Sequence, residues 1–164
     1  MNNTLVLITF DENHTYAKQN RIVGILVGDA IPQSYVGTTD STYYSHYSEI
    51  STVQANWDLH TLGRWDVGAN VYKVVADKTG DTVRAWSGKV PLSQMYFNSS
   101  YPGRFNNKNS SVPWPVPNTN ATYAGRTVLQ SIKTKWGALV EDSAYTTGVE
   151  TPDGLHPELE FKRK

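Results

Sequence analysis

The sequence predicts an α/β domain, in which short apolar strands alternate with helices. Two observations carry this prediction: a continuous apolar run near the N-terminus, and later segments whose apolar residues recur at helical spacing. At 164 residues the chain can form one domain with a sizeable core. Because the first strand is apolar on both faces, we expect it to lie inside a parallel or mixed sheet covered on both sides.

Composition excludes several classes of protein. There is no cysteine, which rules out disulfides, thiol catalysis and cysteine-ligated zinc. Basic and acidic residues balance at 15 each, so net charge gives no argument for a nucleic-acid partner. No apolar run approaches the roughly 20 residues that cross a bilayer, and the N-terminus shows no signal-peptide pattern.

Two strands and one helix are expected in the first part of the chain. The runs TLVLITF (4–10) and NRIVGILVGDAIP (20–32) are short, rich in β-branched residues and bounded by turn residues, which is typical of strands. A helix is expected to begin after Ser45, its N-cap. Its apolar-stripe residues recur at i, i+4, i+7 and i+11 and share one helical face: His46, Ile50, Val53 and Trp57.

The second part is expected to be more irregular. Residues 69–86 resemble a short apolar run, a Lys-Thr-Gly-Asp turn and an extended piece. The proline- and asparagine-rich residues 98–122 predict a long extended loop. A helix is expected within 123–140, opened by Thr127 as a possible cap, and residues 150–164 are expected to form a frayed tail.

Asp11 and Glu12 stand directly after the most apolar run of the chain. Functional groups in open α/β sheets gather beyond the strand ends, and two adjacent carboxylates repel unless a cation or hydrogen bonds relieve them. A divalent metal held through oxygen atoms is one interpretation. The other is a solvated turn, since Asp-Glu is a common pair. The residues themselves leave both open.

His46 is the second candidate. A histidine at a helix N-terminus lies beside free N–H groups that can bind an anion. It can equally be a half-buried residue of the apolar stripe.

Four segments carry a resemblance to a known family: LVLITFDENHTY, NRIVGILVGDAIP, GTTDSTYYSHYSEISTVQANWDLHTLGRWDVGAN and PVPNTNATYAGRTVLQSIKTKWG. Together they resemble the C-terminal part of fungal secreted acid phosphatases, within the phosphoesterase family that includes bacterial phospholipase C. The resemblance implies an alkaline-phosphatase-superfamily-like sandwich with a mixed, mostly parallel sheet. It covers the chain to about residue 139.

The resemblance also implies roles for residues. Asp11 and Glu12 would help to hold one divalent metal ion, and His46 and Ser48 match the family's H-T-S helix start, with Tyr47 replacing Thr. His46 would be a catalytic residue near phosphate or metal, where it would orient or protonate the reacting groups. The segment NHTYAKQN follows the acid phosphatase branch rather than the phospholipase branch.

The function implied is metal-assisted hydrolysis of small phosphate esters. The family's nucleophile and other metal ligands precede this strand, so we expect the chain to be a single partial domain over 1–164 with little or no activity alone. The alternatives are a phospholipase C-type phosphodiesterase and a non-catalytic fragment with a binding role.

The chain carries an excess of N-glycosylation sequons, which predicts a secreted glycoprotein as the full-length parent. Five asparagines head such sequons: Asn2, Asn13, Asn98, Asn109 and Asn120.

Overall fold

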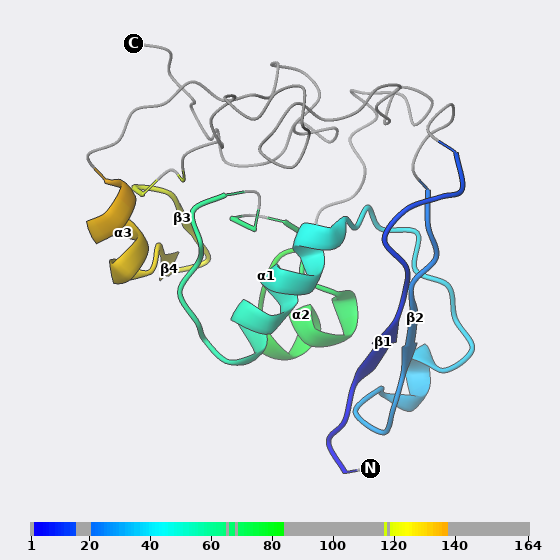
Figure 1. The fold of residues 1–164 in the computed structure, drawn as a ribbon. Coiled ribbons are helices and arrows are strands. Elements are labelled where there is room, and N and C mark those ends of the chain that lie inside the picture. Colours follow the sequence, from blue (N-terminus) through cyan, green and yellow to red (C-terminus); the bar gives the residue numbers. More distant parts are fainter. Residues whose placement is uncertain are drawn as a thin grey trace.

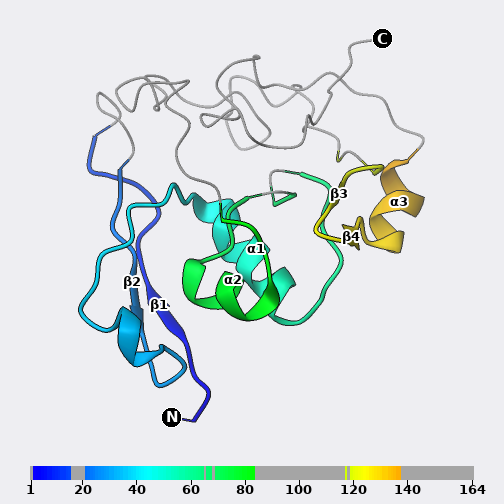
Figure 2. The same cartoon turned by 180° about the vertical axis from the view of Figure 1, so that it is seen from behind.

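The computed structural model describes residues 2–15, 21–64, 66–67, 69–83, 117 and 119–137. Figures 1 and 2 both show two central helices between a strand pair on one side and a small hairpin-and-helix unit on the other. The elements, in chain order, are β1 (Val6–Ile8), β2 (Ile25–Val27), the 3₁₀ turn η1 (Gln33–Tyr35), α1 (His46–Asn56), α2 (Lys73–Thr79), β3 (Thr122–Tyr123), β4 (Arg126–Thr127) and α3 (Gln130–Trp136).

Both strands expected near the N-terminus form, and they pair antiparallel. Val6 lies opposite Val27 and Ile8 opposite Ile25. In the described part of the chain both sheets are two-stranded and antiparallel, and the parallel pairing found there is the isolated bridge between Thr61 and Val128. The expected mostly parallel sheet is therefore not seen in these residues, and the alkaline-phosphatase-like sandwich stays a prediction.

Helix α1 begins where the sequence predicts, after Ser45. The backbone N–H of Ser45 donates to Ser48 Oγ at 3.1 Å, as in a capping box. The apolar stripe of the helix turns outward, however: Ile50, Val53 and Trp57 are 37%, 46% and 65% exposed. The buried residues of α1 are mainly polar: Ser48, Ser51, Thr52, Gln54 and Ala55.

Hydrogen bonds explain how a polar helix face is buried here. Ser51 Oγ donates to the carbonyl of Ala69 at 3.0 Å. Thr52 Oγ1 donates to Ser48 O at 2.6 Å and accepts from the backbone N–H of Tyr72 at 2.9 Å. A buried polar group costs little when it is paired in this way. The α1 face is thus matched to the backbone that precedes α2.

The core lies where α1, α2 and one face of the β1–β2 pair meet. Its buried cluster is formed by Ala55, Val71, Val74, Val75 and Ala76. Leu5 and Leu26 of the strand segments pack against this cluster.

Residues 69–83 differ from the expected extended pieces, because Lys73–Thr79 forms α2, and residues 84–86 of that expectation lie outside the described residues. The Lys-Thr-Gly-Asp sequence, expected as a turn between strands, ends this helix: Gly80 adopts φ 76° and its N–H donates to Ala76 O at 2.8 Å. Burial of three consecutive apolar residues, Val74 to Ala76, on the core favours helix over strand here.

The C-terminal helix is shorter than expected. Residues 122–127 form the β3–β4 hairpin, with positive φ at Ala124 (49°) and Gly125 (77°), so Thr127 belongs to a strand and does not cap a helix. Helix α3 begins at Gln130. The loop expected at 98–122 lies almost wholly outside the described residues, as do 138–140 and the tail at 150–164.

A buried ion pair joins the end of α2 to the β3–β4 hairpin. Arg126 Nη2 lies 2.5 Å from Asp81 Oδ1, and the two side chains are 9% and 2% exposed. Removing one partner of such a pair strongly destabilises the fold, because the other charge stays buried without its counter-charge.

Arg126→Met tests how far the fold depends on this pair. It leaves Asp81 buried without its cation, so we expect the free energy of unfolding to fall by about 3–5 kcal/mol. The matched control is Lys73→Met, which breaks a pair with Asp77 whose side chains are 46% and 45% exposed. That change is expected to have a much smaller effect, because water screens an exposed pair. Urea unfolding followed by circular dichroism measures both, and equal losses would contradict the prediction.

Candidate active site at the end of strand β1

Asp11 and Glu12, the residues predicted as metal ligands, lie exposed just beyond β1. The Glu12 backbone N–H donates to Asp11 Oδ1 at 3.0 Å, which gives this pair a local turn. A carboxylate that accepts one such bond keeps further lone pairs for a cation. The turn geometry is therefore compatible with both interpretations of the acidic pair.

His46 is brought to the same place from α1. Its Nε2 lies 2.7 Å from the backbone carbonyl oxygen of Asp11, and its Nδ1 lies 3.0 Å from Glu49 Oε1. The two sequence-predicted positions, 35 residues apart, are thus in direct contact. In the imidazolium form both ring nitrogens donate, so the ring links the helix start to the strand end.

The surroundings of His46 raise its pKa above the ordinary value. Desolvation alone lowers the pKa, but the hydrogen bonds to the Asp11 carbonyl and the Glu49 carboxylate, with the negative charge of Glu49, outweigh it. Protonation of His46 therefore favours the folded state. This contribution is complete below the unfolded-state pKa and is lost as pH rises through the folded-state pKa.

The residues of the described part do not complete a metal site. No group of three or more histidine, aspartate or glutamate side chains is arranged there to hold an ion. Both nitrogens of His46 are engaged with protein oxygens, so the ring as placed is not a ligand. Asp11 and Glu12 can supply two carboxylates, and a full set needs ligands beyond them.

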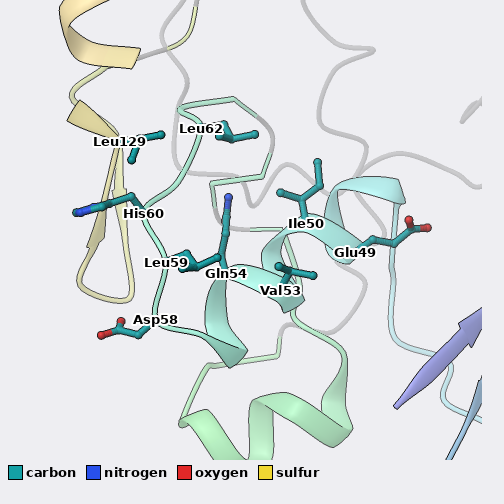
Figure 3. A pocket seen from close by; sticks show the side chains of 9 residues that line it. All are labelled: Glu49, Ile50, Val53, Gln54, Asp58, Leu59, His60, Leu62 and Leu129. Carbon is teal, nitrogen blue, oxygen red and sulfur yellow. The ribbon is translucent and has the colours of Figure 1, made fainter. Parts of the chain in front are cut away.

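An apolar groove of about 560 Å³ lies beside this site. Figure 3 shows it between the outward face of α1 and the segment that follows the helix. Its walls are formed by Ile50, Val53, Leu59, Leu62 and Leu129, with Glu49, Gln54, Asp58 and His60 also lining it. Glu49 therefore belongs both to the groove and to the partner set of His46.

Sequence reasoning missed Glu49. Its place three residues after His46 on a helix puts the two side chains on one face, and this spacing could have identified it. The groove could not be found in this way, because Leu129 reaches it from a distant part of the chain.

Glu49→Gln tests the electrostatic origin of the His46 pKa. We expect the change to lower the pKa of His46 toward its ordinary value, because a neutral amide favours the imidazolium less than a carboxylate does. NMR titration of the histidine rings measures it, with His46→Asn assigning the resonance. The control is Asp58→Asn, which removes an acid beyond the far end of α1 and should leave the pKa unchanged. An unaltered pKa in Glu49→Gln would overturn the attribution.

Comparison with known proteins finds several relatives that carry the same kind of name, acid phosphatase. The chain is 44% identical over 147 residues to a phosphate-repressible acid phosphatase of Penicillium chrysogenum. It is 44% identical over 138 residues to an acid phosphatase of Aspergillus fumigatus, and 39% identical over 148 residues to one of Aspergillus niger. No protein-family profile matches the chain, and no solved structure matches it at a significant level.

These matches cover 89%, 81% and 88% of this chain but 35%, 30% and 34% of the relatives. The chain thus spans about a third of the length of the curated proteins that it matches. The match confirms the resemblance drawn from the sequence: over most of its length, this chain is a homologue of one part of the fungal acid phosphatases.

Proposed function

We propose that this chain forms part of a phosphate-ester hydrolase of acid phosphatase type, with the active centre at the end of β1. The observation that carries the proposal is the contact between His46 and Asp11. It joins the two motifs of the resemblance, the acidic strand end and the histidine helix start, in a chain whose relatives are named acid phosphatases.

In this proposal, Asp11 and Glu12 provide two carboxylates for one divalent metal ion, and the remaining ligands come from outside the described residues. When bound, such an ion would neutralise phosphate charge and polarise the ester. The hydroxyl nucleophile also comes from elsewhere, as the family resemblance implies.

His46 acts as a positioning residue in this scheme. Because its two nitrogens contact Asp11 and Glu49, it fixes the strand end relative to α1 and is not free to bind phosphate itself. Its raised pKa keeps the ring protonated up to a higher pH, so that both nitrogens donate their hydrogen bonds throughout the acidic range.

A chimera tests the function. This chain replaces the matched region of the Penicillium chrysogenum acid phosphatase, and hydrolysis of p-nitrophenyl phosphate is measured. We expect an active chimera, in which Asp11→Asn or Glu12→Gln lowers kcat/KM by about a hundredfold or more, since even outer-shell changes at metal sites cost 10–100-fold. Asp58→Asn is the matched control and should retain activity.

Three outcomes would count against the proposal. A folded chimera without activity would refute the assignment to the hydrolase. Full activity in Asp11→Asn and Glu12→Gln would remove these residues from the metal site. Hydrolysis of phosphatidylcholine in preference to the phosphomonoester would favour the phospholipase C-type alternative.

We also propose that the full-length protein is secreted and glycosylated. Asn2 and Asn120 are exposed, whereas Asn13 is half-buried beside the acidic pair, and its Oδ1 accepts a 2.7 Å hydrogen bond from the backbone of Thr15. No helix in the described ranges is long and apolar enough to span a membrane.

Expression of the chain through a yeast secretory pathway tests glycan addition. We expect glycans at Asn2 and Asn120 and none at Asn13, because a sequon held in a compact turn beside charged groups is less accessible. Peptide mass spectrometry after endoglycosidase treatment reads each position. Modification of Asn13 alone would contradict the prediction.

A further inference from the structure

The apolar groove beside α1 has the size of a site for a small molecule. Its volume of about 560 Å³ lies within the range of roughly 300–1,000 Å³ that is typical of ligand pockets. Figure 3 shows apolar side chains of α1 on one side and those of the segment after the helix, with Leu129, on the other. Five apolar side chains of its walls are 37–46% exposed: Ile50, Val53, Leu59, Leu62 and Leu129.

One end of this groove is joined to the candidate active site. Glu49 lines the groove, and its Oε1 lies 3.0 Å from His46 Nδ1. On the other side of the same ring, Nε2 lies 2.7 Å from the carbonyl oxygen of Asp11. A single imidazole ring therefore separates the groove residue Glu49 from the strand end that carries the acidic pair. A ligand whose phosphate is held at the acidic pair would have the groove within reach of its remaining part.

The charged groups of the groove restrict what it can accept. Figure 3 shows Glu49 and Asp58 at its opposite ends, and no lysine or arginine of the described residues lines it. His60 also lines the groove, but its ring points away from the apolar walls, and its Nδ1 lies 3.2 Å from Thr127 O. Like charges repel, so the two carboxylates disfavour a second phosphate or a carboxylate on the bound molecule.

Gln54 adds an unpaired acceptor to the wall of the groove. The residue is 4% exposed, and its Nε2 donates to Asp66 Oδ2 at 2.9 Å. Its Oε1 has no hydrogen-bond partner in the part of the chain that the structure describes. Buried acceptors are ordinarily paired, because an unpaired one carries a desolvation cost. A hydrogen-bond donor on a molecule bound in the groove would offset this cost.

We propose that the groove is the subsite for the alcohol part of the substrate, and that the enzyme prefers phosphate monoesters of apolar alcohols without a negative charge. The phosphate lies at the acidic strand end, and the alcohol that leaves on hydrolysis packs between α1 and Leu129. Burial of its apolar surface stabilises the complex in proportion to the area removed from water. This inference rests on the proposed function, because it requires the phosphate to be bound at Asp11 and Glu12.

Two esters that differ in their alcohol test the proposal in the chimera with the Penicillium chrysogenum phosphatase. The alcohol of 1-naphthyl phosphate is large and apolar, whereas that of glycerol 2-phosphate is small and polar. Val53→Gln and, separately, Leu59→Gln make the groove more polar at positions that are 46% and 45% exposed. The control is Val36→Gln, at a position that is 58% exposed and does not line the groove. The value of kcat/KM is measured for each ester.

We expect Val53→Gln and Leu59→Gln to lower kcat/KM for 1-naphthyl phosphate by about tenfold, as is typical when apolar contacts with a substrate are lost. The value for glycerol 2-phosphate should stay nearly unchanged, and Val36→Gln should alter neither. Equal responses of the two esters in an active chimera would overturn the proposal. A segment of the longer relatives that fills the groove would give this second result.

Binding of the free alcohol to the 164-residue chain separates this inference from the proposed function, which a folded chimera inactive on both esters would refute. We expect 1-naphthol to shift the methyl NMR signals of Ile50 and Leu129, and glycerol to leave them in place. Val53→Gln should weaken the binding of 1-naphthol, whereas Val36→Gln should not. Unshifted methyl signals at saturating 1-naphthol would overturn the assignment of the groove, even in an active enzyme.

Discussion

The burial of a polar helix face is the constraint on which the other features depend. Ser51 and Thr52 can be buried only because the backbone at Ala69 and Tyr72 satisfies their hydroxyl groups. This pairing fixes the rotation of α1 about its axis. Once the rotation is fixed, the apolar stripe must face away from the core, and the N-terminal turn of the helix faces the end of β1. The groove and the contact between His46 and Asp11 both follow from it.

The contact at His46 shows why a helix start and a strand end can act as one site. Buried packing is not what joins the helix start to the strand end at this contact, since His46, Glu49 and Asp11 are at least partly exposed. The link is polar, and it is strongest when the ring is protonated, because both nitrogens then donate to oxygen atoms. A change in the charge of one ring thus alters the coupling between the two motifs.

The sequence predicted β1, β2, α1 and α3, but it did not show how these elements pack against one another. The apolar runs at 4–10 and 20–32 predicted β1 and β2. A continuous apolar run is typical of a parallel sheet, but here the two strands pair antiparallel, and the pairing partner is not visible in the run itself. The N-cap residue Ser45 predicted the start of α1. The rotation of α1 about its axis depends on hydrogen-bond partners at 66–72, and the helical spacing of the apolar residues does not reveal these partners. Residues 73–79 were misread because β-branched valines before a glycine turn resemble a strand, although burial against the core selects a helix.

The metal role proposed for Asp11 and Glu12 needs further ligands, because the described residues contain no group of three or more histidine, aspartate or glutamate side chains that could hold an ion. A strand end in an α/β fold normally receives its ligand partners from neighbouring segments of the same fold. In the proposed site, the contact with His46 fixes the position of the strand end, and the missing ligands have to come from outside the described residues.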